Sequence, residues 1–297
     1  MSGRDPRALR AALETRLARR AAAAGRSLSE ERRRFATTRF LAAVFTNDPE
    51  GWILKGGVSM MLRLPRARHT KDVDLARADA NIDEAIAQLH QALDDSTDPL
   101  QWQIDTKAAL TGGRDGVRLT VTASCGGKQF EQFGIDLVAG GELVGAIDRH
   151  RIPADPDLPE FEAAAQVLHY PIADQVADKL CAMYQRFGND LPSSRLRDLN
   201  DLLLIQAHDR IPFSDTVDAL ILQQHERAMT LPAALIRPDA TWTARWRVEV
   251  RRFPLPDELH TLDAALARAG VCYTPLLAAV TAGGASAGHW DPDRGAW

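Results

Sequence analysis

The chain has 297 residues, of which 45% are hydrophobic and 26% are charged. This composition suffices for one large or two ordinary domains and excludes a disordered, collagen-like or coiled-coil protein. No apolar run approaches the ~18 residues of a membrane-spanning helix, and the arginine-rich N-terminus lacks the apolar segment of a secretory signal. Widely spaced cysteines indicate neither a disulfide framework nor a zinc knuckle, so we expect a cytoplasmic protein; they are Cys125, Cys181 and Cys272.

The net charge of −4 conceals an asymmetry along the chain. Residues 1–40 contain eleven arginines against four acidic residues, a net of +7, which leaves −11 for the other 257 residues. This distribution excludes a uniformly basic nucleic-acid-binding protein but allows a basic arm on an acidic body. Either the arginines of this arm are solvated on a packed helical hairpin, or they form a surface that also contacts a polyanion.

The first half of the chain predicts an α+β domain. Residues 6–46 are expected to form two helices separated near Gly25, with Ser27 or Ser29 capping the second. The following elements are predicted as a strand at 52–54, a helix at 58–64, a strand at 72–75, a helix at 82–93, and strands at about 101–107, 117–125 and 129–138. This order is typical of a mixed or antiparallel sheet flanked by helices.

The second half is predicted to be almost entirely helical. A proline-rich linker is expected at 153–159, and a loose glycine- and alanine-rich tail after Thr281. The helices are expected at about 172–187, 194–207, 214–227, 231–237 and 256–269. The predicted domains are therefore an N-terminal hairpin at 1–46, a catalytic domain at 47–155 and a helical domain at 156–297.

The most informative stretch is residues 55–75. A glycine pair, Gly56 and Gly57, precedes a helix, and such a turn lets backbone N–H groups approach a phosphate. Asp72 and Asp74 lie two apart on a strand, so both carboxylates project from one face and can hold hard divalent cations together with substrate phosphates. A phosphate-binding turn and a carboxylate pair suit in-line phosphoryl or nucleotidyl transfer.

Each part of this pattern alone has a structural explanation. Turns require glycine, and many strands begin or end with acidic residues. The ordered set of apolar strand, glycine pair, short helix, basic loop and Asp-x-Asp strand is much more specific. Two like charges placed side by side in an apolar setting are costly without a cation, so the set favours a functional site.

The set resembles the signature of the nucleotidyltransferase superfamily, with 14 residues between Gly57 and Asp72. The segments LKGGVSMMLRL and RHTKDVDL resemble the AbiEii-type toxins of type IV toxin–antitoxin systems, which include the mycobacterial MenT group. IADQVADKLCAM and SSRLRDLNDLL resemble the second-half motifs of that family, a lysine on one helix and an Arg-Asp-x-x-Asp start to the next. These matches cover about residues 50–205 and imply a nucleotidyltransferase-like mixed sheet followed by an α-helical domain.

The resemblance assigns roles to individual residues. Asp72 and Asp74 would bind the catalytic Mg²⁺ or Mn²⁺ ions. Lys179 would contact the triphosphate or stabilise transition-state charge, and Asp198 would shape the nucleotide site, with Asp201 on the same helix face. The residues expected to hold nucleotide phosphates are Gly56, Gly57, Ser59, Lys71 and Lys179. The alternative for Lys179 is a surface lysine paired with Asp178 or Gln175.

Asp136 and four arginines complete the candidate site. Asp136, in the apolar strand FGIDLVA, is either a general base for the attacking hydroxyl, as a third carboxylate often is in this superfamily, or an edge-strand acid facing solvent. Four arginines near the motifs either are solvated or bind phosphate and the RNA backbone; they are Arg66, Arg68, Arg195 and Arg197.

The resemblance implies an enzyme that binds a nucleoside triphosphate between its two domains. An acceptor hydroxyl would attack the α-phosphorus and pyrophosphate would leave. In the MenT group the implied acceptor is the 3′ end of tRNA, so the reaction would block aminoacylation and growth, and a cognate antitoxin would be the protein partner, with no membrane involved. The alternatives are a protein hydroxyl or small-molecule acceptor, and a nucleotide-binding regulator without turnover.

Overall fold

The computed structural model describes residues 5–64, 70, 72–110, 116–152, 159–161, 165–253, 255–283 and 288–297. The chain forms two compact units that alternate along the sequence. Unit 1 comprises Met1–Ser59, His69–Gly141 and Asp148–His169, and unit 2 comprises Met60–Arg68, Glu142–Ile147 and Tyr170–Trp297. The chain enters unit 2 for the last time at Tyr170, which is later than the predicted domain boundary at residue 155.

Unit 1 begins with the predicted helical hairpin, α1 (Pro6–Ala23) and α2 (Leu28–Asn47). Ser27 caps α2 in a capping box: the Glu30 amide donates to Ser27 Oγ (3.2 Å), and the Ser27 amide donates to Glu30 Oε2 (2.9 Å). This reciprocal pair satisfies two N–H groups at the start of the helix. The prediction of two helices divided near Gly25 is confirmed.

A seven-stranded mixed sheet forms the centre of unit 1. Its strands are β1 (Ile53–Lys55), β2 (Asp72–Arg77), β3 (Gln101–Ala109), β4 (Gly116–Cys125), β5 (Lys128–Ala139), β6 (Asp148–Ile152) and β7 (Ala165–His169). The order across the sheet is β3-β4-β5-β2-β1-β7-β6. β2 pairs in parallel with β5, β1 pairs in parallel with β7, and the other neighbours are antiparallel. The predicted mixed α+β fold is confirmed, although β6 and β7 were not foreseen.

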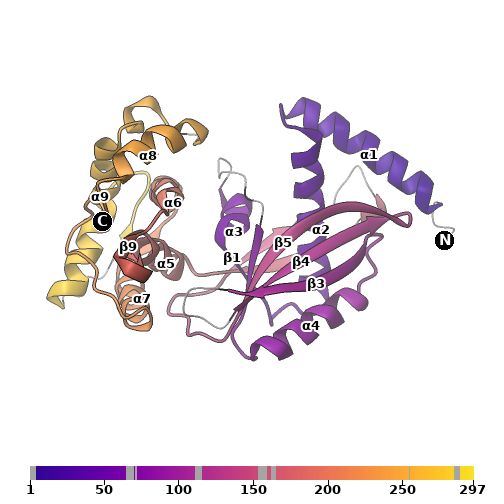
Figure 1. Ribbon diagram of the computed structural model, residues 1–297, viewed down its shortest axis with the longest axis horizontal. Helices are drawn as coiled ribbons and strands as arrows, with labels where there is room; N and C mark the ends of the chain where they lie inside the picture. Colours follow the sequence, from indigo (N-terminus) through magenta and orange to yellow (C-terminus); the bar gives the residue numbers. More distant parts are fainter. Residues whose placement is uncertain are drawn as a thin grey trace. The chain divides into compact units, whose positions relative to one another are not determined.

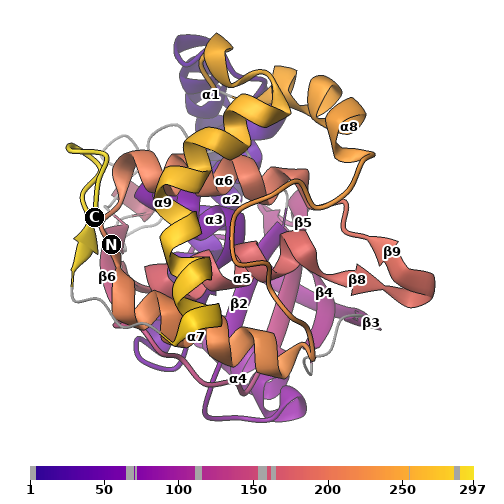
Figure 2. The same ribbon diagram turned by 90° about the vertical axis from the view of Figure 1, so that its left-hand side faces the viewer.

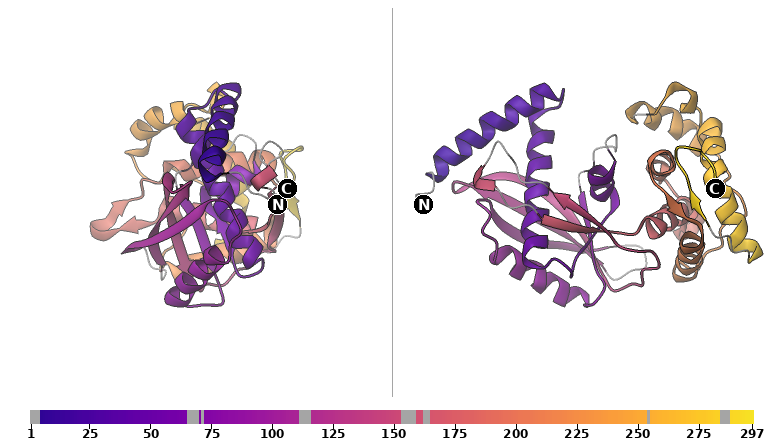
Figure 3. Two further views of the ribbon diagram at one scale, coloured as in Figure 1. Left: turned by 90° about the vertical axis from the view of Figure 1, so that its right-hand side faces the viewer. Right: turned by 180° about the vertical axis from the view of Figure 1, so that it is seen from behind.

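Helices α2 and α4 (Ile82–Asp94) lie beside each other and pack on the sheet, where α2 contacts β5 and β7 (Figures 1 and 3). Phe40 of α2 packs edge-on against Phe133 of β5, with ring centroids 5.6 Å apart. Phe133, Ile135 and Leu137 are buried at alternate positions of β5, so Asp136 projects from the opposite face. The face of the sheet that the helices cover is therefore apolar and buried, and the opposite face carries polar side chains such as Asp136.

Unit 2 is mainly helical, as predicted. Its longer helices are α5 (Ile172–Tyr184), α6 (Leu196–His208), α7 (Phe213–Glu226), α8 (Trp242–Glu249) and α9 (Leu262–Ala282), and α3 (Gly56–Arg63) begins in unit 1 and runs into unit 2. Figure 2 shows α9 crossing α6 and α7, and a small hairpin of β8 (Arg186–Phe187) and β9 (Leu191–Pro192) at one side. Short 3₁₀ turns and a second two-stranded pairing complete the unit: η3 (Val250–Arg252), η4 (Asp257–Leu259), β10 (Ile211–Pro212) and β11 (His289–Trp290).

By length and composition alone, α9 is long and apolar enough to cross a membrane. Nine of its residues, Leu276 and Leu277 among them, are buried in the core of unit 2 together with residues of α5, α6 and α7. Its contacts with α6 and α7 are those of a core helix in a folded domain.

Two predictions for the second half are wrong. Residues 231–237 do not form a helix: the Tyr184 hydroxyl holds this segment as a loop by donating to the Ile236 carbonyl (2.7 Å) and accepting from its amide (3.0 Å). The end of the chain is not loose over residues 288–297, because Trp290 is buried and its indole donates to the Gln206 carbonyl (2.7 Å). The expected linker lies almost wholly at 153–158, outside the described residues.

Candidate active site

Three aspartates share the polar face of the unit 1 sheet. Asp72 and Asp74 alternate with the buried Val73 on β2, and Asp74 lies directly opposite Asp136 of the parallel neighbour β5. Their side chains are partly accessible, 45% for Asp72 and 27% for Asp136. Asp136 is thus not a solvent-facing edge acid: β5 is an interior strand, and the carboxylate is next to the predicted metal-binding pair.

Gly56 makes room for one of these carboxylates. A Cβ atom at Gly56 would lie 1.9 Å from Asp74 Oδ2, and Gly56 also has a left-handed φ of +63°. Gly134 has a similar relation to Asp72, whose Oδ1 would lie 2.6 Å from an added Cβ. The first glycine of the predicted turn is therefore required sterically, because any side chain there would displace the Asp74 carboxylate.

Gly57 and Ser59, which were also predicted to bind phosphate, contact Thr70 and His169 respectively. A Cβ at Gly57 would lie 2.8 Å from the Thr70 side chain. Ser59 is fully buried, and its hydroxyl oxygen is 2.8 Å from Nδ1 of His169, the last residue of β7. In this arrangement Ser59 ties α3 to the sheet, and its role in phosphate binding stays a prediction.

Arg118 of β4 joins the aspartates on this face. Its Nη2 lies 2.8 Å from Asp72 Oδ2, and its Nε lies 3.0 Å from Asp136 Oδ1. One guanidinium thus bridges carboxylates of two adjacent strands and offsets their repulsion. This residue was missed in the sequence, and its position shows that the carboxylate face attracts a cation.

The donor set of this face suits a divalent metal ion. It offers only carboxylate oxygens, which Mg²⁺ and Mn²⁺ prefer, and the Asp74 carboxylate lies in the space that Gly56 leaves. Within the described part of the chain, no three His, Cys, Asp or Glu side chains are placed to hold a metal by themselves. A metal held by Asp72 and Asp74 would therefore take its other ligands from water and substrate phosphates, as Mg²⁺ commonly does.

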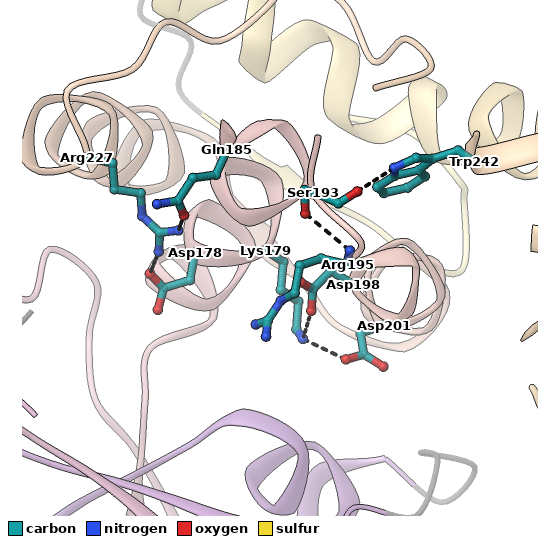
Figure 4. Close-up of polar contacts among 9 residues, drawn as sticks. All are labelled: Asp178, Lys179, Gln185, Ser193, Arg195, Asp198, Asp201, Arg227 and Trp242. Atoms are coloured by element: carbon teal, nitrogen blue, oxygen red, sulfur yellow. Dashed lines mark hydrogen bonds and ion pairs between the residues drawn. The ribbon is translucent and has the colours of Figure 1, made fainter. Parts of the chain in front are cut away.

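Unit 2 contains a buried ionic cluster around Lys179. The side chain of Lys179 on α5 is 9% exposed, and its Nζ lies 3.3 Å from Asp198 Oδ1 and 2.7 Å from Asp201 Oδ2, both on α6. Figure 4 shows Lys179 directed at these two carboxylates. The alternative of a surface lysine paired with Asp178 is wrong, since Asp178 instead accepts from Arg227 Nη2 at 2.8 Å.

The start of α6 is fixed by a chain of hydrogen bonds. The buried indole of Trp242 donates to the Ser193 carbonyl (2.8 Å), and Ser193 Oγ accepts from the Arg195 amide (3.2 Å). Arg195 Nε then donates to Asp198 Oδ2 (2.8 Å) while most of the arginine side chain remains exposed. These contacts set the position at which Asp198 meets Lys179 (Figure 4).

Cysteine chemistry is not available beside this cluster. Cys181 follows Lys179 by two residues on α5 and is buried. Burial raises the pKa of its thiol to about 12, so the nucleophilic thiolate is essentially absent near neutral pH. The cluster therefore provides no cysteine nucleophile near neutral pH.

Comparisons with known proteins agree with this geometry. The family model described as Nucleotidyl transferase AbiEii toxin, Type IV TA system, matches residues 39–268. The chain belongs to this family. The matched range includes every candidate site residue and extends beyond residue 205, where the recognisable motifs end.

Two solved structures were found to be similar in fold. MenT4, a nucleotidyltransferase toxin from Mycobacterium tuberculosis, is 17% identical over 91% of this chain and 89% of its own, with a TM-score of 0.55. JHP933 from Helicobacter pylori is 13% identical over 86% of this chain and 94% of its own, with a TM-score of 0.47. No curated protein matches the chain. The likeness to MenT4 shows that this AbiEii family member has the fold of a nucleotidyltransferase toxin.

The arginines of the N-terminal hairpin lie mostly outside the matched range, and several are used within the chain. Arg32 Nε donates to Glu14 Oε2 (2.7 Å), and Arg33 Nη2 donates to Glu131 Oε1 (2.8 Å). Arg10 donates to three backbone carbonyls near the turn between β4 and β5. For these arginines the structure favours a packed hairpin over a free polyanion-binding arm.

Several predicted phosphate-binding residues lie outside the described residues, namely Arg66, Arg68 and Lys71. Arg195 and Arg197 are described, and the side chain of each is more than half exposed. Arg197 Nε is 3.8 Å from Glu249 Oε2 of α8. Both arginines lie at the start of α6, on the same helix as Asp198.

Proposed function

We propose that this protein is the toxin of a type IV toxin–antitoxin pair and transfers nucleotides from a nucleoside triphosphate to the 3′ end of tRNA. The observation that carries the transferase part is the aspartate face, where Asp72, Asp74 and Asp136 lie on adjacent parallel strands with a glycine clearing space for Asp74. Membership of the AbiEii family supports nucleotidyl transfer as the chemistry of that face and implies an antitoxin partner.

Asp136 is the proposed general base. In the proposed reaction the terminal ribose hydroxyl of the acceptor attacks the α-phosphorus, the bond to the β-phosphate oxygen breaks, and pyrophosphate leaves. Asp136 accepts the hydroxyl proton, since its carboxylate lies beside the metal-binding pair and is partly accessible. Arg118 is paired with both Asp72 and Asp136 and offsets the repulsion between their carboxylates while no metal is bound.

Lys179 is the proposed binding residue for the triphosphate. It is the cation of a cluster whose two carboxylates fix its position, and a fixed ammonium group can stabilise charge that develops on phosphate oxygens. In this proposal Asp198 and Asp201 orient Lys179, and the backbone of Gly56 and Gly57 approaches the phosphates.

A divalent metal, Mg²⁺ or Mn²⁺, is the proposed cofactor, held by Asp72 and Asp74. When bound, it supplies charge neutralisation and polarisation of phosphate oxygens. The acceptor tRNA is cytoplasmic, which supports the same location for the toxin, and all three cysteines are free in the structure.

Arg118 is expected to compete with the metal for the aspartates. Replacing Arg118 by glutamine removes a positive charge bound to Asp72 and Asp136, and a unit charge at ~4 Å contributes about 1–4 kcal/mol near a protein surface. We expect R118Q to bind Mn²⁺ about tenfold more tightly than the parent protein, as measured by titration calorimetry. R149Q, which breaks the exposed Arg149–Glu50 pair, is the matched control and should leave Mn²⁺ affinity unchanged. Unchanged or weaker binding by R118Q would show that Arg118 does not occupy the metal position.

Labelled transfer tests the proposed reaction. Each of the four ribonucleoside triphosphates, labelled at the α-phosphate, is incubated with the protein, Mg²⁺ and purified tRNA. We expect label on the tRNA, pyrophosphate release in equal amount, and no product when chelator removes the metal. tRNA whose 3′-terminal ribose has been oxidised by periodate is the control, because it has no free acceptor hydroxyl.

The same experiment separates the alternatives. If the label appears on the protein itself or on a small molecule and not on tRNA, the protein is still a nucleotidyltransferase, but its acceptor is not tRNA. Triphosphate binding without pyrophosphate release would indicate a non-catalytic regulator and contradict the proposal.

A further inference from the structure

Four of the six exposed residues of α8 and the adjoining turn η3 are arginines. Trp242, Trp246 and Val250 are buried, and at helical spacing they define one face that packs into unit 2. The opposite arc carries four exposed arginines with the exposed Val248 among them. We call these four residues the arginine face: Arg245, Arg247, Arg251 and Arg252.

Little of this charge is neutralised within the chain. Residues 242–252 contain four arginines and one acid, Glu249, a net of +3 in a protein whose total is −4. Among the described residues, Arg252 lies 3.3 Å from Glu249, and no side-chain ion pair is formed by Arg245, Arg247 or Arg251. Elsewhere in unit 2, Arg186 is paired with Asp190 and Arg237 with Asp263, whereas Arg210, Arg268 and Arg294, far apart in sequence, form no ion pair among the described residues. The arginine face differs in gathering three such arginines within seven residues.

The arginine face is joined to the Lys179 cluster within the same unit. α8 begins at Trp242, whose indole holds the Ser193 carbonyl at the start of α6, as Figure 4 shows. Glu249 links the other end of α8 to α6 through Arg197. The arginine face, Arg197 and Arg195 therefore follow one another along packed elements that lead to Asp198 and Lys179.

The composition of this face favours a polyanion over a protein partner. Protein interfaces depend on a buried apolar or aromatic centre, whereas here the only large apolar side chain on the exposed arc is Val248. Arginine guanidinium groups suit phosphate oxygens, which they bind in a bidentate manner. A surface on which three of four arginines have no ion pair among the described residues has the positive charge that captures a nucleic-acid backbone.

We propose that the arginine face binds the sugar-phosphate backbone of the acceptor RNA and directs its 3′ end toward the Lys179 cluster. The inference rests on the proposed function, because it assigns a surface for the acceptor of that reaction. The proposed RNA-binding surface is therefore α8 and η3 and not the N-terminal arm, where Arg32 and Arg33 are paired within the chain.

Charge reversal at two positions tests this surface. The variant R247E/R251E is compared with R186E/R237E, which changes the charge of unit 2 by the same amount away from the arginine face. Binding of fluorescent tRNA is measured by anisotropy between about 50 and 200 mM salt, with no triphosphate present. We expect R247E/R251E to weaken binding at least about tenfold at low salt and to reduce the salt slope by about 1–2, while the control changes both much less. R247K/R251K, which keeps both charges, should retain most of the affinity.

Two further readouts separate this inference from the proposed function. Triphosphate binding by R247E/R251E, measured by thermal shift with a non-hydrolysable analogue, should equal that of the parent protein, while KM for tRNA rises. If the parent protein transfers nucleotides to tRNA but R247E/R251E binds tRNA normally, or if both double variants lose binding equally, the arginine face is not the RNA surface. If the parent protein neither binds nor labels RNA, the proposed function itself fails.

Discussion

Replacing Asp74 by asparagine is expected to abolish nucleotide transfer and toxicity while leaving the protein folded. Asparagine has nearly the same shape, so it fits the space over Gly56, but it lacks the negative charge that a divalent cation requires. Loss of one electrostatically stabilising group at an active site typically lowers the rate by about 10²–10³-fold. The measurement is transfer of labelled nucleotide to tRNA, with Mn²⁺ binding by calorimetry as a second readout.

Asp79 provides the matched control for Asp74. It lies just after β2, is 68% exposed and is paired with Arg77 on the same sheet. D79N removes one carboxylate of the same type and should leave transfer within about twofold, since surface ion pairs contribute little. Transfer by D74N within tenfold of the parent rate, or unchanged Mn²⁺ affinity, would contradict the role assigned to the aspartate pair.

Replacing Lys179 by methionine is expected to abolish transfer and also to destabilise the protein. The variant keeps the length of the side chain but leaves Asp198 and Asp201, both almost completely buried, without their common cation. Removing one partner of a buried ionic cluster typically costs about 3–5 kcal/mol of the free energy of unfolding. K179M alone therefore does not distinguish a binding residue from a structural one.

The double variant K179M/D201N makes that distinction. It removes the lysine together with its nearer carboxylate partner, so the cluster loses one positive and one negative charge and most of the lost stability should return. We expect denaturant unfolding of the double variant to approach that of the parent protein while transfer remains undetectable. Recovery of transfer together with stability would show that Lys179 only holds α5 and α6 together.

The local features of the fold were predictable from sequence where short-range chemistry decides them. Ser27 and Glu30 specify a capping box by their spacing alone, and Asp72 and Asp74 share a face because strand side chains alternate. The glycine pair was also recognisable, but the steric reason for Gly56 at the start of α3 was not, because it depends on the carboxylate of Asp74 on β2.

Arg118 could not be assigned to the site from sequence because its position depends on a strand irregularity. Continuing the pairing next to the Gly126–Gly127 turn without a shift would place Arg118 opposite Ile135 instead of Asp136. The register shift between Ala123 and Ser124 moves the pairing by one residue, which places Arg118 opposite Asp136. The alternation of Val117, Leu119 and Val121 places Arg118 on the polar face, but the register shift decides that its partner on β5 is Asp136.

The ion pairs of Lys179 could not be predicted from sequence either, because they depend on how α5 packs against α6. Its neighbours along α5, Asp178 and Gln175, were the nearest candidates in sequence, but its actual partners lie on α6. The second-half motif pointed to the correct residues without indicating that the lysine is buried between two carboxylates. Local spacing identifies which residues matter here, and only tertiary packing shows what they contact.

The alternation of the two units along the chain has a consequence for folding. β1, an interior strand of the first sheet, has its parallel neighbour in β7, so the sheet cannot be completed before the chain has been made to residue 169. Met60 and Leu64, in turn, belong to the apolar core that α5 to α9 enclose. Neither unit is a continuous stretch of the gene, and no single cut divides the chain into two complete parts. A truncation at any single position therefore removes part of the sheet or part of the helical core from at least one unit.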